Sequence, residues 1–302
     1  MSLSVGIVGL PNAGKSSLFN ALTRAGAAVA GYPFTTIEPH HGIAAVPDPR
    51  IEAVAGVTQP DRTVPATVEF VDIAGLVRGA HSGEGLGNQF LAHIREVDAI
   101  VHVVRCFTAA DVPHVEGAVD PMRDIEIVET ELAFANLAKP VLYVANISEN
   151  DLPAGPCAEL VVGHAQAHGA IAVPLSVKLE AEVAELGGRE GDELLRAYGL
   201  TEPGLFRLIR AAYDLLSLIT FFTTASREVR AWAVPSGTLA PEAAGKIHTD
   251  MHRGFIKAEV IGWRELIEAG SLQKARDRGL VRLEGKEYAV TDGDVMLFRF
   301  AV

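Results

Sequence analysis

The motif GLPNAGKS, at Gly9–Ser16, directly follows a short β-branched run, Leu3–Val8. It fits the pattern G-x-x-x-x-G-K-[S/T], and the next residues, Lys15–Arg24, have the i/i+4 apolar spacing of a helix. A strand, a glycine-rich turn and a helix N-terminus together make a phosphate-binding loop. The small residues let backbone N–H groups approach the phosphates, and the helix end adds partial positive charge. The motif therefore predicts an α/β domain of the P-loop nucleotide-binding type.

The positions of this motif have separate expected roles. Lys15 is expected to bridge the β- and γ-phosphate oxygens, and the Ser16 hydroxyl to bind Mg²⁺. The side-chain oxygen of Asn12 is a candidate ligand for K⁺ beside the phosphates, where it would supply positive charge. The remaining nucleotide contacts are assigned to Ala13, Gly14 and Ser17.

Strand-like and helix-like segments alternate over the first 215 residues, which predicts a mostly parallel sheet with helices on both faces. The expected strands are Leu3–Val8, Thr67–Ile73, Ala99–Cys106, Pro140–Asn146 and Ala170–Leu175. The expected helices are Lys15–Arg24, Gly87–Glu96, Pro121–Leu137, Ala158–His168 and Thr201–Ile219. Ligands of such sheets bind at the carboxyl ends of the strands, where the other motifs of this chain lie.

A second motif, Asp72-Ile73-Ala74-Gly75, follows the second expected strand. Asp72 is expected to hold Mg²⁺ through water, and the Gly75 N–H to contact the γ-phosphate. Thr35 and Thr36 lie in a loop between the two motifs. A threonine there can complete the Mg²⁺ shell when the γ-phosphate is present, which makes a switch.

The residue after this motif is Leu76, where many related GTPases carry a water-orienting glutamine. An aliphatic side chain cannot orient water, so hydrolysis requires another group. The candidates are His81, Glu84 and His114.

The fourth expected strand ends in Asn146-Ile147-Ser148-Glu149, where a guanine-specific site has N-K-x-D. Glu149 is one methylene longer than aspartate, which displaces the bidentate acceptor of the guanine edge. We therefore predict weak guanine selectivity, with adenine accepted. Asn146 has two candidate roles: to bond the base edge, or to tie the P-loop to this loop. Ser176, after the fifth strand, matches the last loop that flanks the base.

The composition is that of a globular protein, with 302 residues and a formal charge of −12. The charge is uneven, because Leu216–Val302 has a net charge of +1 and the rest carries −13. From about Phe221 the pattern changes to short strands and turns, with one helix at Trp263–Ala269, which predicts a small α+β module. Cys106 and Cys157 show no CxxC pattern, so neither a disulfide framework nor a zinc site is expected. No signal peptide and no membrane span are evident, which indicates a cytoplasmic protein.

The chain resembles the YchF/Obg-like ATPase family of P-loop NTPases over nearly its whole length. The segments that carry the resemblance are Gly9–Thr23, Tyr32–Pro39, Asp72–Leu91, Asn146–Glu149, Glu228–Trp232 and Ala243–Asp250. The N-x-x-E form separates this family from the Obg GTPases proper, which keep N-K-x-D.

The resemblance implies Mg²⁺-dependent hydrolysis of ATP to ADP, with some use of GTP, and association with ribosomes or ribosomal RNA. It favours Thr36 over Thr35 as the metal ligand and His114 over His81 as the catalytic group. It also implies two domains, a nucleotide-binding domain over residues 1–218 and a ubiquitin-like TGS domain over residues 219–302, in a monomer. The family's coiled-coil arm has no counterpart at Ala138-Lys139-Pro140, where the chain joins helix to strand directly. Either the protein lacks the arm, or that segment is not in this sequence.

Two alternatives stay open. The first is a nucleotide-binding adaptor with negligible turnover, which the aliphatic Leu76 favours. The second is a true GTPase.

Overall fold

The computed structural model describes residues 3–30, 36–38, 41–73, 86–225 and 227–301. The chain divides into two compact units, each described here by itself. The first comprises Met1–Ala45 and Val68–Leu216, and the second comprises Val46–Thr67 and Ser217–Val302. No helix among the described residues is long and apolar enough to cross a membrane.

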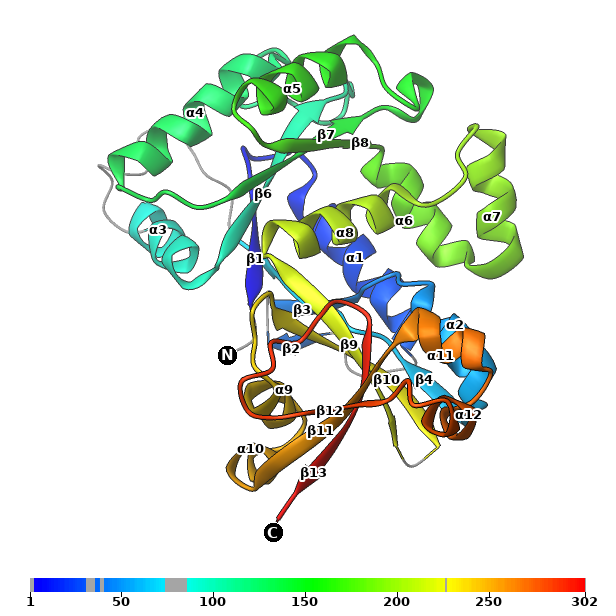
Figure 1. Cartoon of the computed structure of the whole chain (residues 1–302). Helices are drawn as coiled ribbons and strands as arrows, with labels where there is room; N and C mark the ends of the chain where they lie inside the picture. Colours follow the sequence, from blue (N-terminus) through cyan, green and yellow to red (C-terminus); the bar gives the residue numbers. More distant parts are fainter. Residues whose placement is uncertain (1–2, 31–35, 39–40, 74–85, 226, 302) are drawn as a thin grey trace. The chain divides into compact units, whose positions relative to one another are not determined.

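The first unit is built on a sheet whose described strands run in the order β2-β3-β5-β1-β6-β7-β8 (Figure 1). The strands are β1 (Ser4–Val8), β2 (Thr36–Glu38), β3 (His41–Ala45), β5 (Thr67–Asp72), β6 (Ala99–Cys106), β7 (Val141–Ile147) and β8 (Ile171–Leu175). Strands β5, β1, β6, β7 and β8 are parallel to one another, while β2 and β3 pair antiparallel at one edge. The mostly parallel sheet is therefore confirmed.

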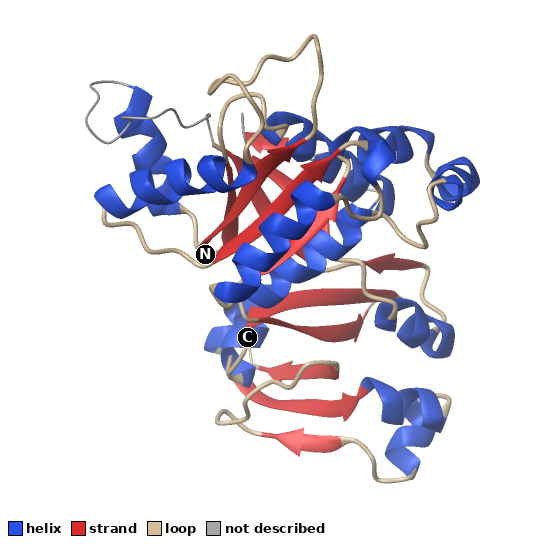
Figure 2. Cartoon of the chain, turned by 90° about the horizontal axis from the view of Figure 1, so that it is seen from above, coloured by secondary structure: helices blue, strands red, loops and turns tan. Residues whose placement is uncertain are grey.

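Helices cover both faces of this sheet (Figure 2). They are α1 (Lys15–Ala30), α3 (Leu86–Glu96), α4 (Pro121–Phe134), α5 (Pro156–Ala167), α6 (Val177–Leu186), α7 (Gly188–Ala197) and α8 (Gly204–Leu215). Helices α3, α4 and α5 bury apolar clusters against β1, β5, β6 and β7. Both sides of β6 are buried along its whole length, as expected for a central parallel strand.

Helix α4 shows how the sequence sets the ends of one element. Asp120 caps its first turn by accepting from the Arg123 N–H at 3.1 Å, and Pro121 occupies the first helical position. At the other end Asn136 adopts a left-handed conformation (φ 55°), and the Leu137 N–H closes back on the Leu132 carbonyl. The chain enters β7 only a few residues later, at Val141, with no helical hairpin between the two elements.

The second unit contains a six-stranded sheet among the described residues, in the order β12-β11-β13-β9-β10-β4. Its strands are β4 (Arg62–Val64), β9 (Leu218–Ala225), β10 (Glu228–Pro235), β11 (Phe255–Gly262), β12 (Arg282–Glu284) and β13 (Asp294–Phe300). Its helices are α2 (Arg50–Thr58), α9 (Ala240–Ile247), α10 (Thr249–Arg253), α11 (Trp263–Ala269) and α12 (Leu272–Asp277). One core of this unit packs Phe221, Phe255 and Phe298 against the small alanine face of α9.

Several sequence-based boundaries differ from the structure. Residues 46–67, which we expected in the first domain, group with the second unit. The segment Gly245–His248, one of the short strands that the pattern after Phe221 predicts, lies in and just after helix α9. The helix is stabilised by the buried face of Ala240, Ala243 and Ala244. The expected helix Thr201–Ile219 is shorter: Pro203 sets the start of α8, and β9 already begins at Leu218.

Candidate functional site

The phosphate-binding loop joins β1 to α1, and its glycines are required by close backbone and side-chain approaches. A Cβ on Gly9 (φ +148°) would lie 2.4 Å from the Val103 carbonyl oxygen. A Cβ on Gly14 (φ +103°) would lie 2.4 Å from Nδ2 of Asn146. Both distances are far inside van der Waals contact, so neither position tolerates a side chain without movement of its neighbours.

Lys15 is buried at the first position of α1, and its Nζ donates to the Leu10 carbonyl at 3.0 Å. Burial lowers the pKa of Lys15, and the charge of Asp72 opposes that shift. The ammonium group therefore folds back onto the loop and feels the charge of the Asp72 carboxylate. A bound phosphate would be its expected partner at this position.

The two expected metal ligands of this region lie together. The Ser16 hydroxyl donates to Oδ2 of Asp72 at 2.8 Å, and Oδ1 of Asp72 is buried with no hydrogen-bond partner among the described residues. A buried carboxylate oxygen without a donor carries a desolvation cost that a divalent cation would remove. Hydroxyl and carboxylate oxygens are also the ligands that Mg²⁺ prefers, so this pair fits the ion.

The other expected ligands of the metal and the γ-phosphate are not tested by the geometry. Thr36 begins β2, but its side chain is not described. Gly75, Thr35, Leu76, His81 and Glu84 lie outside the described residues. Among the described residues, no group of three or more His, Cys, Asp or Glu side chains could hold a metal ion.

Asn146 ties three segments together at the end of β7. Its Nδ2 donates to the Ala13 carbonyl at 2.9 Å, and its Oδ1 accepts from the Val177 N–H at 3.1 Å. Of the two roles considered for Asn146, contact with the base edge and connection of the two loops, the structure shows the connection between the P-loop and the next loop. Ser176, fully buried, caps α6 by accepting from the Leu179 N–H at 3.5 Å.

Glu149 lies in a short 3₁₀ turn after β7, Glu149–Asp151, and is paired with Lys178. The Lys178 Nζ lies 2.5 Å from Oε1 of Glu149, and this hydrogen bond is the largest cause that lowers the pKa of Glu149. The carboxylate at the position of the base-reading motif therefore already has a cationic partner. No spacing in the sequence predicted this pair.

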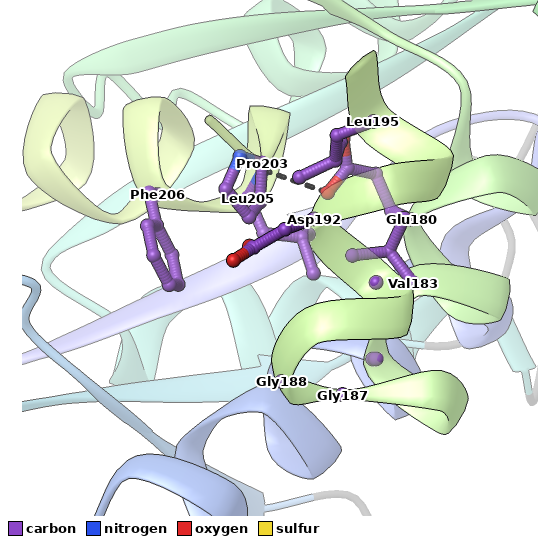
Figure 3. Close-up of a pocket in the computed structure, with 11 residues that line it drawn as sticks. Glu180, Val183, Gly187, Gly188, Asp192, Leu195, Pro203, Leu205 and Phe206 are labelled. Atoms are coloured by element: carbon purple, nitrogen blue, oxygen red, sulfur yellow. Dashed lines mark hydrogen bonds between the residues drawn. The ribbon is translucent and has the colours of Figure 1, made fainter. Parts of the chain in front are cut away.

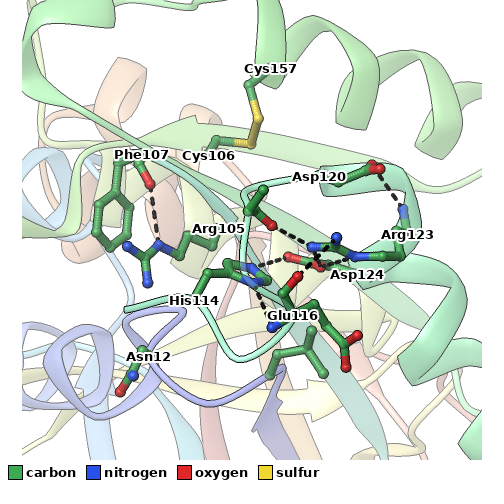
Figure 4. A network of polar contacts seen from close by, with 12 residues as sticks. Asn12, Arg105, Cys106, Phe107, His114, Glu116, Asp120, Arg123, Asp124 and Cys157 are labelled. Carbon is green, nitrogen blue, oxygen red and sulfur yellow. Dashed lines mark hydrogen bonds and ion pairs between the residues drawn. A yellow bond between two sulfur atoms is a disulfide. The ribbon is translucent and has the colours of Figure 1, made fainter. Parts of the chain in front are cut away.

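His114 lies in the loop after β6 and is held on both ring nitrogens (Figure 4). Its Nδ1 accepts from the Glu116 N–H at 3.1 Å, so Nε2 carries the hydrogen that is donated to Oδ2 of Asp124 at 2.8 Å. Both side chains are only 3% exposed, so the histidine is part of a buried network. Arg123 adds a second contact to Asp124, at 3.1 Å.

Sequence reasoning missed two residues that hold the His114 loop. Arg105, at the end of β6, is buried and donates to carbonyls of this loop. Asp124, on α4, fixes the histidine ring. An arginine inside the apolar strand AIVHVVRC was the one available signal, because a buried arginine requires partners.

The expectation that the two cysteines would not pair is wrong. Cys106 ends β6 and Cys157 lies in the first turn of α5, and the two form a disulfide with Cα atoms 5.5 Å apart (Figure 4). They are separated by 51 residues in sequence, so only the adjacency of β6, β7 and α5 brings them together.

A cavity of about 190 Å³ lies among α6, α7 and the start of α8 (Figure 3). Val183, Leu195, Leu205 and Phe206 supply its apolar walls, with glycines at the α6–α7 junction. The buried Glu180 carboxylate accepts from the Gly204 and Leu205 N–H groups, at 2.7 and 3.2 Å, so its visible role is to cap α8. None of the motif residues lines this cavity.

The parallel sheet, the glycine-dependent loop and the Lys15–Ser16–Asp72 cluster together define a P-loop nucleotide-binding protein. Comparisons with known proteins agree: residues 4–147 match a family described as "50S ribosome-binding GTPase". Residues 218–301 match YchF-GTPase_C, described as "Protein of unknown function (DUF933)". The chain belongs to the YchF family.

Relatives named "Ribosome-binding ATPase YchF" in Haemophilus influenzae and Bacillus subtilis are 45% and 42% identical, with 100% of both chains covered. The solved structure of the Schizosaccharomyces pombe YchF GTPase matches with a TM-score of 0.85 and 32% identity, covering 99% of this chain and 98% of that one. The alignment with the H. influenzae relative extends over 363 positions, 61 more than the 302 residues here. At least that many aligned positions therefore have no residue in this chain.

Proposed function

We propose that this protein is a Mg²⁺-dependent nucleoside triphosphatase that hydrolyses ATP to ADP and phosphate and associates with ribosomes. The observation that carries the nucleotide part is the contact of Ser16 with Asp72, whose second oxygen is buried and has no hydrogen-bond partner among the described residues. The charge of Asp72 also acts on Lys15. In this proposal the Ser16 hydroxyl and Asp72 hold Mg²⁺, with Thr36 as the switch-dependent ligand. The ion supplies positive charge for the phosphate oxygens.

The chain's own residues then bind the phosphates. Lys15 exchanges its bond to the Leu10 carbonyl for β- and γ-phosphate oxygens, and backbone N–H groups of the loop surround the β-phosphate. Gly75 offers its N–H to the γ-phosphate. The Nδ2 of Asn12 donates to the Pro113 carbonyl at 3.1 Å, and its side-chain oxygen is the proposed ligand of K⁺.

His114 is our proposed catalytic group, in the place of the usual glutamine. Its ring has one tautomer in the structure, with the hydrogen on Nε2, held by Asp124. To orient the attacking water, the ring must exchange these partners for water and the γ-phosphate.

ATP is the proposed substrate in preference to GTP. The acceptor that would read the guanine N–H groups is a glutamate, and Lys178 already occupies it. Adenine has no such requirement for a free carboxylate. The relatives in H. influenzae and B. subtilis are named ribosome-binding ATPases, which supports the same substrate and the same partner.

We propose that the second unit is a TGS-type binding module, that the protein is a cytoplasmic monomer, and that the 61 missing positions correspond to the family's helical arm. The junction of α4 with β7 supports the last point, because it is closed by a complete C-terminal cap at Asn136.

A second function, a nucleotide-binding adaptor with negligible turnover, is favoured by one observation. His114 is buried and fully bonded, so it is not presented to solvent or to the phosphate loop. The two functions differ in the rate of hydrolysis and not in binding.

Steady-state phosphate release from ATP separates these functions, measured with and without ribosomes and with K⁺ or Na⁺. We expect slow release that ribosomes and K⁺ increase, and loss of at least about 100-fold in Lys15→Ala. The exposed Lys286→Ala, in the second unit, is the matched control and should keep the wild-type rate. Full turnover in Lys15→Ala would refute the proposal, and ADP binding without turnover under every condition would favour the adaptor.

A further inference from the structure

The loop between β6 and α4 is held by one buried arginine, Arg105 (Figure 4). Arg105 donates from Nε to the Phe107 carbonyl at 3.2 Å, and from its two terminal nitrogens to Pro113 at 3.2 Å and Val112 at 2.7 Å. Its guanidinium also lies over the Phe107 ring, 4.5 Å from the ring centre. One side chain therefore fixes both ends of the segment 107–113.

This use of a buried cation is costly, which indicates that the position of the loop matters. Among the described residues, no ion pair includes Arg105. Burial lowers the pKa of Arg105, and the charge of Asp124 opposes that shift. Carbonyl dipoles alone compensate a buried charge less well than a carboxylate does. The planar fork of arginine can hold three carbonyls at once, and a lysine ammonium cannot reproduce that geometry.

The Pro113 carbonyl is shared between this arginine and the phosphate loop. It accepts from Arg105 at 3.2 Å and from Nδ2 of Asn12 at 3.1 Å. Pro113 directly precedes His114, whose ring is held on its other side by Asp124. A continuous chain of contacts thus runs from the P-loop through one carbonyl to His114.

We propose that Arg105 is a positioning residue for His114: it fixes the Pro113 carbonyl against Asn12, and so sets the place of the histidine relative to the phosphates. The proposal rests on the proposed role of His114 in hydrolysis. The hydrogen bonds of Arg105 go to carbonyls of residues 107, 112 and 113 and not to the phosphate loop, so we expect it to act on the rate of the chemical step and not on nucleotide affinity.

The test is a double-mutant cycle on ATP hydrolysis with Arg105→Lys, His114→Ala and the double variant. We expect Arg105→Lys to lower kcat by about 10- to 100-fold, since a misplacement of about 1 Å has that effect, with ADP affinity by calorimetry within about threefold of wild type. The double variant should match His114→Ala within about twofold, because Arg105 acts through the histidine.

Arg207→Lys is the matched control, since Arg207 also donates to a backbone carbonyl, that of Pro174 at 2.9 Å, outside the His114 loop. It should keep the wild-type kcat. If Arg105→Lys does not fold, Arg105→Gln is the second variant, because its planar amide has two N–H donors and cannot hold three carbonyls at once. It should lower kcat in the same non-additive way with His114→Ala.

The outcomes distinguish the two proposals. An unchanged kcat in Arg105→Lys, or losses that multiply in the double variant, would overturn the role of Arg105 while His114 stays catalytic. An unchanged kcat in His114→Ala would instead refute the role of the histidine.

Discussion

The role of each side chain at this site depends on whether it already has hydrogen-bond partners within the protein. Asn146 uses its side-chain amide to join Ala13 to Val177, so it holds the P-loop and the next loop together. Lys15 and Asp72 are opposite cases. The buried Lys15 ammonium donates to a neutral carbonyl, and Oδ1 of Asp72 has no hydrogen-bond partner in the part of the chain that the structure describes. Polar groups with unmet bonding capacity mark where a ligand binds, and satisfied groups mark what holds the site in shape.

Lys178→Met should shift base selectivity toward guanine. With the lysine removed, the Glu149 carboxylate becomes available to the guanine N–H groups, and a hydrogen bond to a charged acceptor is worth enough for about a tenfold change. We expect the ratio of the GDP to the ADP dissociation constant to fall by about tenfold in calorimetric titration.

The exposed Arg189→Met, which breaks a surface pair with Glu193 on α7, serves as the control and should leave this ratio unchanged. The same ratio in Lys178→Met as in wild type would show that Lys178 does not set base preference.

At the scale of elements, helix α8 depends on a side chain supplied by a neighbouring helix. Helix α8 begins at Gly204 after Pro203, and no side chain of its own caps it. Glu180 of α6 does so, with one carboxylate oxygen on each of two N–H groups. Gly204 is also required there, because a Cβ would lie 2.8 Å from that carboxylate.

Glu180→Ala should lower the free energy of unfolding by about 2 to 3 kcal/mol, since it leaves two buried N–H groups without an acceptor. Urea denaturation of the whole chain measures this loss. Glu182→Ala, exposed on the same helix, is the control and should change stability by less than about 0.5 kcal/mol. Equal stability of the two variants would contradict the capping role.

At the scale of the whole molecule, the second unit is discontinuous in sequence. Strand β4 pairs with β10 at one edge of its sheet, and α2 packs with α11. Arg50 bonds Asp292 and lies 5.7 Å from the centre of the Phe222 ring. The segment 46–67 is therefore part of this unit's structure.

A fragment of residues 217–302 should consequently be less stable than the unit it comes from. We expect it to unfold at lower urea concentration, or to lack a cooperative transition by circular dichroism. A version with residues 46–67 joined to Ser217 through a long flexible linker should regain cooperativity. If the short fragment unfolds as cooperatively and at the same urea concentration, β4 and α2 are dispensable.

The stability of the chain should also depend on pH through His102 of β6. Burial lowers its pKa from 6.5 to about 4, with the charges of Glu129, His164 and Lys15 as smaller influences. The unfolded chain therefore takes up the proton first as the pH falls, and stability is lost between about pH 6.5 and 4.

His102→Phe should remove about 2 to 3 kcal/mol of the difference in unfolding free energy between pH 7 and pH 4.5, measured by urea denaturation. The exposed His252→Gln should keep the full difference. An unaltered pH dependence in His102→Phe would place the effect elsewhere.

Local patterns predicted much of this protein. The apolar runs predicted β1, β6, β7 and β8 to within one residue, because a buried parallel strand must be apolar throughout. The P-loop motif predicted Lys15 and Ser16, and the second motif predicted Asp72, since a loop that approaches phosphates allows few alternatives.

Contacts between distant segments could not be predicted in this way. The buried Arg105 on the His114 loop, the Lys178–Glu149 pair and the Cys106–Cys157 disulfide each join residues whose spacing carries no periodic signal. The grouping of residues 46–67 with the second unit likewise depends on contacts between distant segments. The sequence by itself determined the class of fold and the phosphate chemistry, because both follow from short-range pattern and backbone geometry. The tertiary structure alone decided which side chains are already satisfied and which remain for a ligand, because that depends on packing between segments far apart in the chain.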